Sequence, residues 1–62
     1  MYDYVIRDID KNNLFNIESL FELSIGDVIE YKEKYYEVVN KVYPVNGWRI
    51  VKRVLVVEEV EQ

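Results

Sequence analysis

Apolar residues recur along this 62-residue chain in short segments separated by turn-forming residues, a pattern typical of β-strands. Residues 2–9 alternate between apolar and polar positions and end at the turn-forming run Asp10-Lys11-Asn12-Asn13. Further strands are predicted at 28–31, at 35–43 and at 48–57, the last with a bend midway. The pattern therefore predicts an all-β fold.

Turn-forming residues divide these predicted strands into hairpins. Gly26-Asp27 precedes the second strand, and Lys32-Glu33-Lys34 forms a polar connection to the third. Pro44-Val45-Asn46-Gly47 is predicted to close another turn, because proline presets φ and Asn-Gly adopts positive φ easily. We expect residues 1–62 to form a single small β-barrel domain of four or five antiparallel strands.

The segment between the first two turns has two interpretations. Leu14, Ile17 and Phe21 lie at helical spacing behind Asn13, a possible N-cap, which favours one or two helical turns near 13–20. The same segment also fits extended chain, with one apolar face made of Phe15, Ile17, Phe21, Leu23 and Ile25. We expect the short helical segment followed by extended chain, and keep the strand as the alternative.

The composition excludes several kinds of site. The chain has no cysteine and no histidine, so it cannot form disulfides, Cys/His zinc sites or a thiol nucleophile. Its two glycines fit turns better than a phosphate-binding loop. Asp8, Asp10 and Asn12 have the spacing that begins a calcium loop, but the required glycine and distal glutamate are missing. We expect no catalysis, no cofactor and no metal site.

Charge is unevenly distributed along the chain, whose formal net charge is −4. Residues 1–31 and the C-terminal residues 57–62 are acidic, whereas residues 32–56 carry six basic side chains against two acidic ones. Such a contrast can orient a partner on the surface.

Aromatic and basic side chains coincide in the middle of the sequence. The candidate binding surface consists of Tyr31, Tyr35, Tyr36, Tyr43, Trp48 and Arg49. Small barrels bind single-stranded nucleic acid on such rings, although a pI near 4.6 argues against it. The alternative is that Tyr36 or Tyr31, together with Trp48, fills the barrel core.

The last predicted strand is apolar on both faces at Val54, Leu55, Val56 and Val57. One face would enter the core, and so short a chain has little left to cover the other. The sequence therefore predicts a protein partner or a homo-oligomer at these four residues. No apolar run is long enough to span a bilayer, so we expect no membrane association and a cytoplasmic location.

Several motifs follow the order of landmarks in an SH3 domain. They are Tyr2-Asp3-Tyr4, Glu22-Leu23-Ser24-Ile25 leading into Gly26-Asp27-Val28-Ile29, then Gly47-Trp48, and Val57-Glu58-Glu59. The chain thus resembles an SH3-like small barrel, which implies a fold and not a function.

A second resemblance covers about 20 residues. Ile25-Gly26-Asp27-Val28-Ile29-Glu30-Tyr31, followed by Tyr35-Tyr36-Glu37-Val38-Val39 and Val42, looks like the β-hairpin of tailed-phage head–tail connector and neck proteins. That resemblance implies a phage or mobile-element origin, assembly into a ring, a location in the host cytoplasm or the virion, and no catalysis.

These observations leave one leading hypothesis and two alternatives. The leading one is a non-enzymatic protein-interaction or assembly module encoded by a phage. The first alternative is a barrel that binds single-stranded nucleic acid. The second is an acidic inhibitor of a host enzyme, with Asp8 and Asp10 or Glu58 and Glu59 occupying a basic groove.

Overall fold

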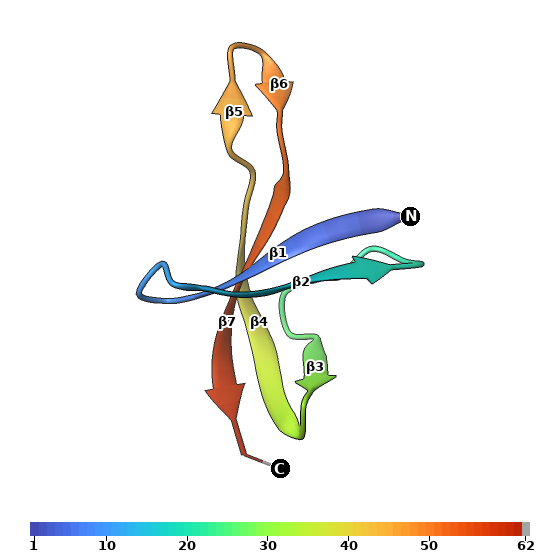
Figure 1. The fold of residues 1–62 in the computed structure, drawn as a ribbon, viewed down its shortest axis with the longest axis vertical. Coiled ribbons are helices and arrows are strands. Elements are labelled where there is room, and N and C mark those ends of the chain that lie inside the picture. Colours follow the sequence, from blue (N-terminus) through green and yellow to red (C-terminus); the bar gives the residue numbers. More distant parts are fainter. Residues whose placement is uncertain (62) are drawn as a thin grey trace.

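The computed structural model describes residues 1–61, which contain seven strands and no helix (Figure 1). The strands are β1 (Tyr2–Asp8), β2 (Asn13–Ser19), β3 (Val28–Tyr31), β4 (Lys34–Val42), β5 (Val45–Asn46), β6 (Arg49–Ile50) and β7 (Arg53–Val60). Five of them form one curled sheet in the order β2-β1-β7-β4-β3, and β5 and β6 form a separate two-stranded ribbon. The prediction of a small all-β fold is confirmed.

The sheet is mixed, which differs from the antiparallel barrel that was expected. β1 and β7 run parallel, in a register from Tyr4 opposite Arg53 to Asp8 opposite Val57, whereas the other pairs are antiparallel. Parallel neighbours need a long crossover connection, and here residues 9–52 provide it. The hairpin signals in the sequence are local, so they did not indicate this long-range pairing.

The predicted helical segment near 13–20 is wrong, because residues 13–19 form strand β2. Phe15, Ile17 and Ser19 are half-buried while the residues between them are exposed, which is the two-residue period of a strand. Phe21 and Ile25, which the strand alternative placed on the same face, are exposed in the loop after β2.

The β3–β4 and β5–β6 turns both contain residues with positive φ. The β3–β4 turn has Lys32 at 51° and Glu33 at 68°, which confirms the predicted polar connection. The β5–β6 turn lies later in the sequence than the predicted turn at residues 44–47. Asn46 is already the last residue of β5, and Gly47, with φ of 67°, turns the chain together with Trp48.

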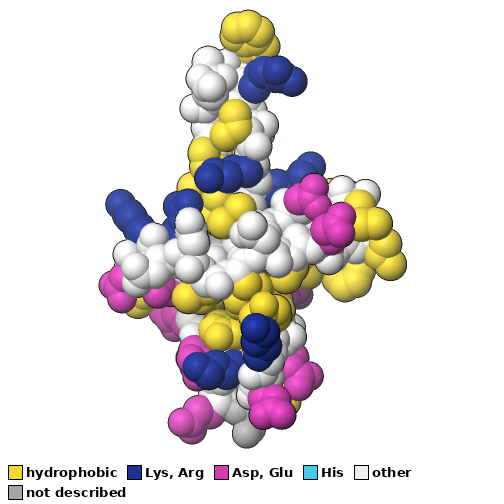
Figure 2. Space-filling view, in the orientation of Figure 1, with side chains coloured by type: hydrophobic (Ala, Val, Ile, Leu, Met, Phe, Trp, Pro, Cys, Tyr) yellow, Lys and Arg dark blue, Asp and Glu magenta, His cyan; other side chains and the backbone are white. Residues whose placement is uncertain are grey.

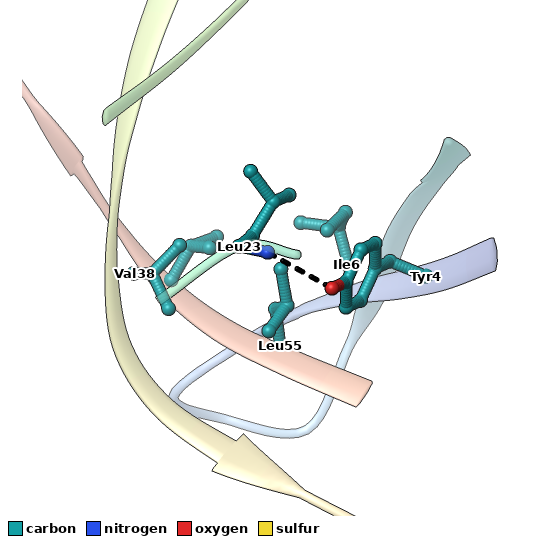
Figure 3. Packing of buried hydrophobic residues seen from close by; sticks show 6 residues of the cluster. Tyr4, Ile6, Leu23, Val38 and Leu55 are labelled. Atoms are coloured by element: carbon teal, nitrogen blue, oxygen red, sulfur yellow. Dashed lines mark hydrogen bonds between the residues drawn. The ribbon is translucent and has the colours of Figure 1, made fainter. Parts of the chain in front are cut away.

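The core lies on the concave face of the sheet, under the loop that joins β2 to β3 (Figure 3). Leu23 enters it from that loop, and its backbone N–H donates a hydrogen bond of 2.9 Å to the buried Tyr4 hydroxyl. The remaining members come from three strands: Tyr4 and Ile6 on β1, Val38 on β4, and Leu55 and Val57 on β7.

Aromatic contacts bring the two edges of the sheet together. Phe15 of β2 stacks on Tyr31 of β3 with ring centroids 3.9 Å apart, and Tyr36 of β4 meets Phe15 edge-on at 5.4 Å. Within residues 1–61 no backbone pairing joins β2 to β3, so the sheet closes only as a half-barrel. This architecture is compatible with an SH3-like barrel.

The four β7 residues predicted as an interface are mostly buried within the chain itself. Val54, Leu55 and Val57 are buried and Val56 is half-buried. In the register, Val54 is flanked by Val5 of β1 and Val42 of β4. Of the four side chains, Val56 is therefore the one with most surface left for a partner.

Removal of the Tyr4 hydroxyl should destabilise the fold out of proportion to its size. In Tyr4→Phe the buried Leu23 N–H loses its acceptor, and an unsatisfied buried group costs about 1–3 kcal/mol. We expect urea unfolding to show that loss of stability. Tyr35→Phe, whose hydroxyl makes no hydrogen bond within residues 1–61, is the control and should stay near the wild-type value. Equal effects of the two variants would contradict the role of this bond.

The β1–β2 turn is organised by one carboxylate. Oδ1 of Asp8 accepts hydrogen bonds of 2.9 Å from the backbone N–H groups of Asp10 and Asn12, and Oδ2 accepts one of 3.2 Å from the Asn12 amide. The bond from the Asn12 backbone contributes most to holding the pKa of Asp8 below its ordinary value. This turn also sets the register of β1 against β2.

The lowered pKa of Asp8 makes the turn sensitive to acid. Because the folded pKa lies below the unfolded value of about 3.9, the contribution of Asp8 is full at neutral pH and is lost as pH falls through the folded pKa. We expect Asp8→Ala to be less stable than wild type at pH 7 and the difference to shrink at about pH 2. Urea titrations at the two pH values measure this, with Asp10→Ala as control. A difference that does not change with pH would contradict the assignment.

Candidate functional site

A hairpin arm, residues 43–52, joins the end of β4 to the start of β7 and projects from the sheet (Figure 1). Val42 and Val54 form the last pair of the β4–β7 ladder, and β5 and β6 form the outer part of the arm. The arm accounts for much of the 40 Å long axis of the molecule. It is the part of the chain least covered by the rest of the fold.

The local sequence explains why the ladder breaks and resumes. Pro44 has no N–H to donate, but its carbonyl accepts a hydrogen bond of 3.1 Å from the Val51 N–H. Val45 then pairs with Ile50 and Asn46 with Arg49, before Gly47 reverses the chain. The arm is therefore a short, hydrogen-bonded ribbon.

The arm exposes apolar side chains that a small domain normally buries. Trp48 at its tip is 91% exposed, and Val45 and Ile50 are 62% and 61% exposed. The interpretation of Trp48 as a core residue is wrong, whereas Tyr36 packs against the core as expected. Contiguous exposed apolar surface of this kind marks interaction sites in soluble proteins.

Two side-chain contacts lie at the base of the arm. The Lys41 Nζ lies 3.2 Å from Glu22 Oε2, and the Tyr43 hydroxyl together with this carboxylate raises the pKa of Lys41. On the other strand, the Arg53 guanidinium lies 5.2 Å from the centre of the Tyr2 ring. Side chains from β4, β7, β1 and the β2–β3 loop thus meet at the base of the arm.

All charged side chains of the arm, and of the parts of β4 and β7 next to it, are basic. Between Glu37 and Glu58 the chain has no acidic residue and four basic ones, Lys41, Arg49, Lys52 and Arg53. Figure 2 shows hydrophobic and basic side chains together along the arm, and the acidic side chains lie elsewhere on that face. The arm is both apolar and positively charged.

The structure separates the aromatic and basic residues that the sequence grouped together. Tyr43, Trp48 and Arg49 lie in the arm. Tyr31, Tyr35 and Tyr36 lie around the β3–β4 turn, at the other end of the long axis (Figure 1). Tyr31 is occupied by its stack on Phe15, so the six residues do not form one binding surface.

A second apolar surface, which the sequence analysis missed, lies where β2 leads into its loop. Leu20 is 82% exposed and Phe21 is 66% exposed. The Ser19 hydroxyl donates to the Phe21 carbonyl at 2.6 Å and accepts from the Phe21 N–H at 3.2 Å, which fixes the backbone there. The buried Leu23 anchors the loop just beyond, so Leu20 and Phe21 are held at the surface.

Acidic side chains surround this second surface. Glu18 and Glu22 flank it in sequence, and the β1–β2 register places Asp3 directly opposite Glu18. Like charges opposite one another weaken strand pairing. We call Leu20, Phe21, Asp3, Glu18 and Glu22 the acidic loop patch. Its only sequence signal is the pair of apolar residues enclosed by two glutamates.

Residues 1–61 contain no group of three or more carboxylates placed to hold a metal ion. No helix in the same residues is long and apolar enough to cross a membrane. Comparisons with known proteins give no match: no family model, no curated protein and no solved structure is significantly similar to this chain.

Truncation of Trp48 should leave the fold intact. Because the side chain is almost fully exposed, we expect Trp48→Ser to change the free energy of unfolding by less than about 0.5 kcal/mol. Leu55→Ala, in the core, should cost about 2–5 kcal/mol. Urea unfolding followed by far-ultraviolet circular dichroism measures both. A loss at Trp48 comparable to that at Leu55 would show that the arm packs on the sheet.

Proposed function

We propose that the protein is a non-enzymatic interaction or assembly module that binds another protein chain through the hairpin arm. The observation that carries this proposal is the exposed apolar surface of a hydrogen-bonded ribbon, with Trp48 at its tip. The four β7 residues predicted as the interface are replaced in this role by the arm, because three of them are buried.

Energetics support a protein partner for Trp48. Aromatic side chains bury about 150–250 Å² each, which at about 25 cal/mol/Å² is a gain of roughly 4–6 kcal/mol before the cost of association. Tryptophan and arginine are also the residues most enriched in binding hot spots, and Trp48 and Arg49 are adjacent. A ribbon held by its own hydrogen bonds loses little conformational entropy on binding.

An SH3-like barrel, a phage origin and a role in a connector-like assembly belong to this proposal. The half-barrel and the resemblance of the 25–31 hairpin support them. Genes for capsid and tail proteins on either side of this gene would support the origin, and with it a location in the host cytoplasm or the virion. The acidic-inhibitor alternative remains a prediction, tested by charge reversal at Glu58 and Glu59.

Single-stranded nucleic acid is the second candidate ligand. The observation that favours it is an exposed Trp48 next to Arg49, since bases stack on such rings beside cations. The separation of Tyr31, Tyr35 and Tyr36 from the arm leaves only a small stacking surface. For this reason we place it below a protein partner.

A photo-reactive benzoylphenylalanine in place of Trp48 distinguishes the two candidates. In cells that produce the protein, we expect ultraviolet light to link position 48 to a protein chain, either another protein or a second copy. The same substitution at Ile9, which is 60% exposed on the β1–β2 turn, is the control and should give no such product. Adducts to nucleic acid alone, or identical adducts from both positions, would contradict the proposal.

A further inference from the structure

The molecule carries two exposed apolar surfaces whose charges are opposite. The arm presents Trp48 and Ile50 with basic neighbours. The acidic loop patch presents Leu20 and Phe21 with acidic neighbours, of which Glu22 alone has an ion-pair partner within residues 1–61. Both surfaces have apolar area that a contact would cover, and the charge of each is opposite to the charge of the other.

The tip of the arm lies away from the acidic loop patch of its own chain. The arm extends along the long axis, whereas the β2–β3 loop lies at the side of the sheet (Figures 1 and 2). Only the base of the arm comes near the acidic side chains, where Lys52 lines one hollow with Asp3 and Glu18. Trp48 at the tip is 91% exposed, so contact between Trp48 and an acidic loop patch requires a second copy.

Contacts between identical surfaces are opposed by charge. Two arms face to face would bring Arg49 and Lys52 of both copies together, and two acidic loop patches would do the same with Asp3 and Glu18. Like charges across an interface cost free energy, whereas an arm against a patch pairs opposite charges. Electrostatics therefore selects the pairing of unlike surfaces.

We infer that the partner of the arm is a second copy of this chain, whose acidic loop patch receives Trp48 in a head-to-tail contact. This inference rests on the proposed function and adds the identity of the partner to it. The two surfaces of such a contact differ, so a pair of copies keeps one free arm and one free patch, and the association continues from copy to copy. The small area involved predicts weak, concentration-dependent self-association.

A mixing experiment tests the head-to-tail geometry. The arm-blocked chain carries Trp48→Ser and Ile50→Ser, and the patch-blocked chain carries Leu20→Ser and Phe21→Ser, all at exposed positions. Sedimentation over a wide concentration range should show self-association of the wild type and monomers for each variant alone. An equimolar mixture should form a dimer and nothing larger, because only one arm and one patch remain compatible. Circular dichroism checks that both variants are folded.

Charge reversal tests the electrostatic part with changes that do not touch apolar residues. We expect Arg49→Glu and Glu18→Lys each to weaken self-association at least about tenfold, as at an interface hot spot. A chain with both changes should regain most of the wild-type affinity. The effects should fall at about 1 M salt, where the Debye length is about 3 Å.

The outcomes separate this inference from the proposed function. A wild type that stays monomeric at all concentrations, a mixture that stays monomeric while the wild type associates, or a double charge variant as weak as the single ones would each overturn the inference. If position 48 is still linked to a different protein in cells, the proposed function survives that result. If it is linked to no protein and the chain is monomeric, both fail.

Discussion

Strand β7 is the constraint on which the rest of the structure depends. It lies in the middle of the five-stranded sheet, with β1 parallel on one side and β4 antiparallel on the other. Leu55 and Val57 enter the core. Val54 points to the other face of the sheet and is also buried, with β1 and β4 on either side. This one strand supplies three of the six largest fully buried side chains in the part of the chain that the structure describes, Val54, Leu55 and Val57.

The same pairing also produces the arm. β4 extends past the end of β3 on the side where the arm begins, and β7 begins there at Arg53, opposite Tyr4 of β1. Beyond Val42 and Arg53 no strand of the sheet pairs with the chain, and Pro44 and Gly47 shape what remains into a separate ribbon. The core and the candidate binding site are consecutive parts of one long hairpin, which is why truncating Trp48 and truncating Leu55 should have such different consequences for stability.

Local features of the sequence predicted local features of the structure. The Lys32-Glu33 connection and the alternating first strand are present, and the last predicted strand is interrupted at residues 51–52 rather than bent. The wrong prediction, a helical segment near 13–20, concerned a segment whose structure depends on a distant neighbour. The spacing of Leu14, Ile17 and Phe21 fits a helix, but pairing with β1 makes the segment a strand. Likewise, Val54 to Val57 looked exposed because the parallel pairing of β1 was not visible from local patterns. No local signal separates Trp48 at a tip from Trp48 in a core.

The distribution of charge acquires a different meaning once the fold is known. Along the sequence it is a basic middle between acidic ends, and folding could have mixed these segments. The β4–β7 hairpin carries Arg49 outward on the arm, while Asp3 and Glu18 are paired across β1 and β2 at the side. Lys52, at the base of the arm, lines one hollow with these two carboxylates. In an isolated chain, the hydration of the exposed Trp48 side chain costs free energy, and so does the repulsion between the Asp3 and Glu18 carboxylates. A contact that covers Trp48 and neutralises Glu18 would relieve both at once, and the angle between arm and loop would then decide whether successive copies close into a ring or continue as a filament.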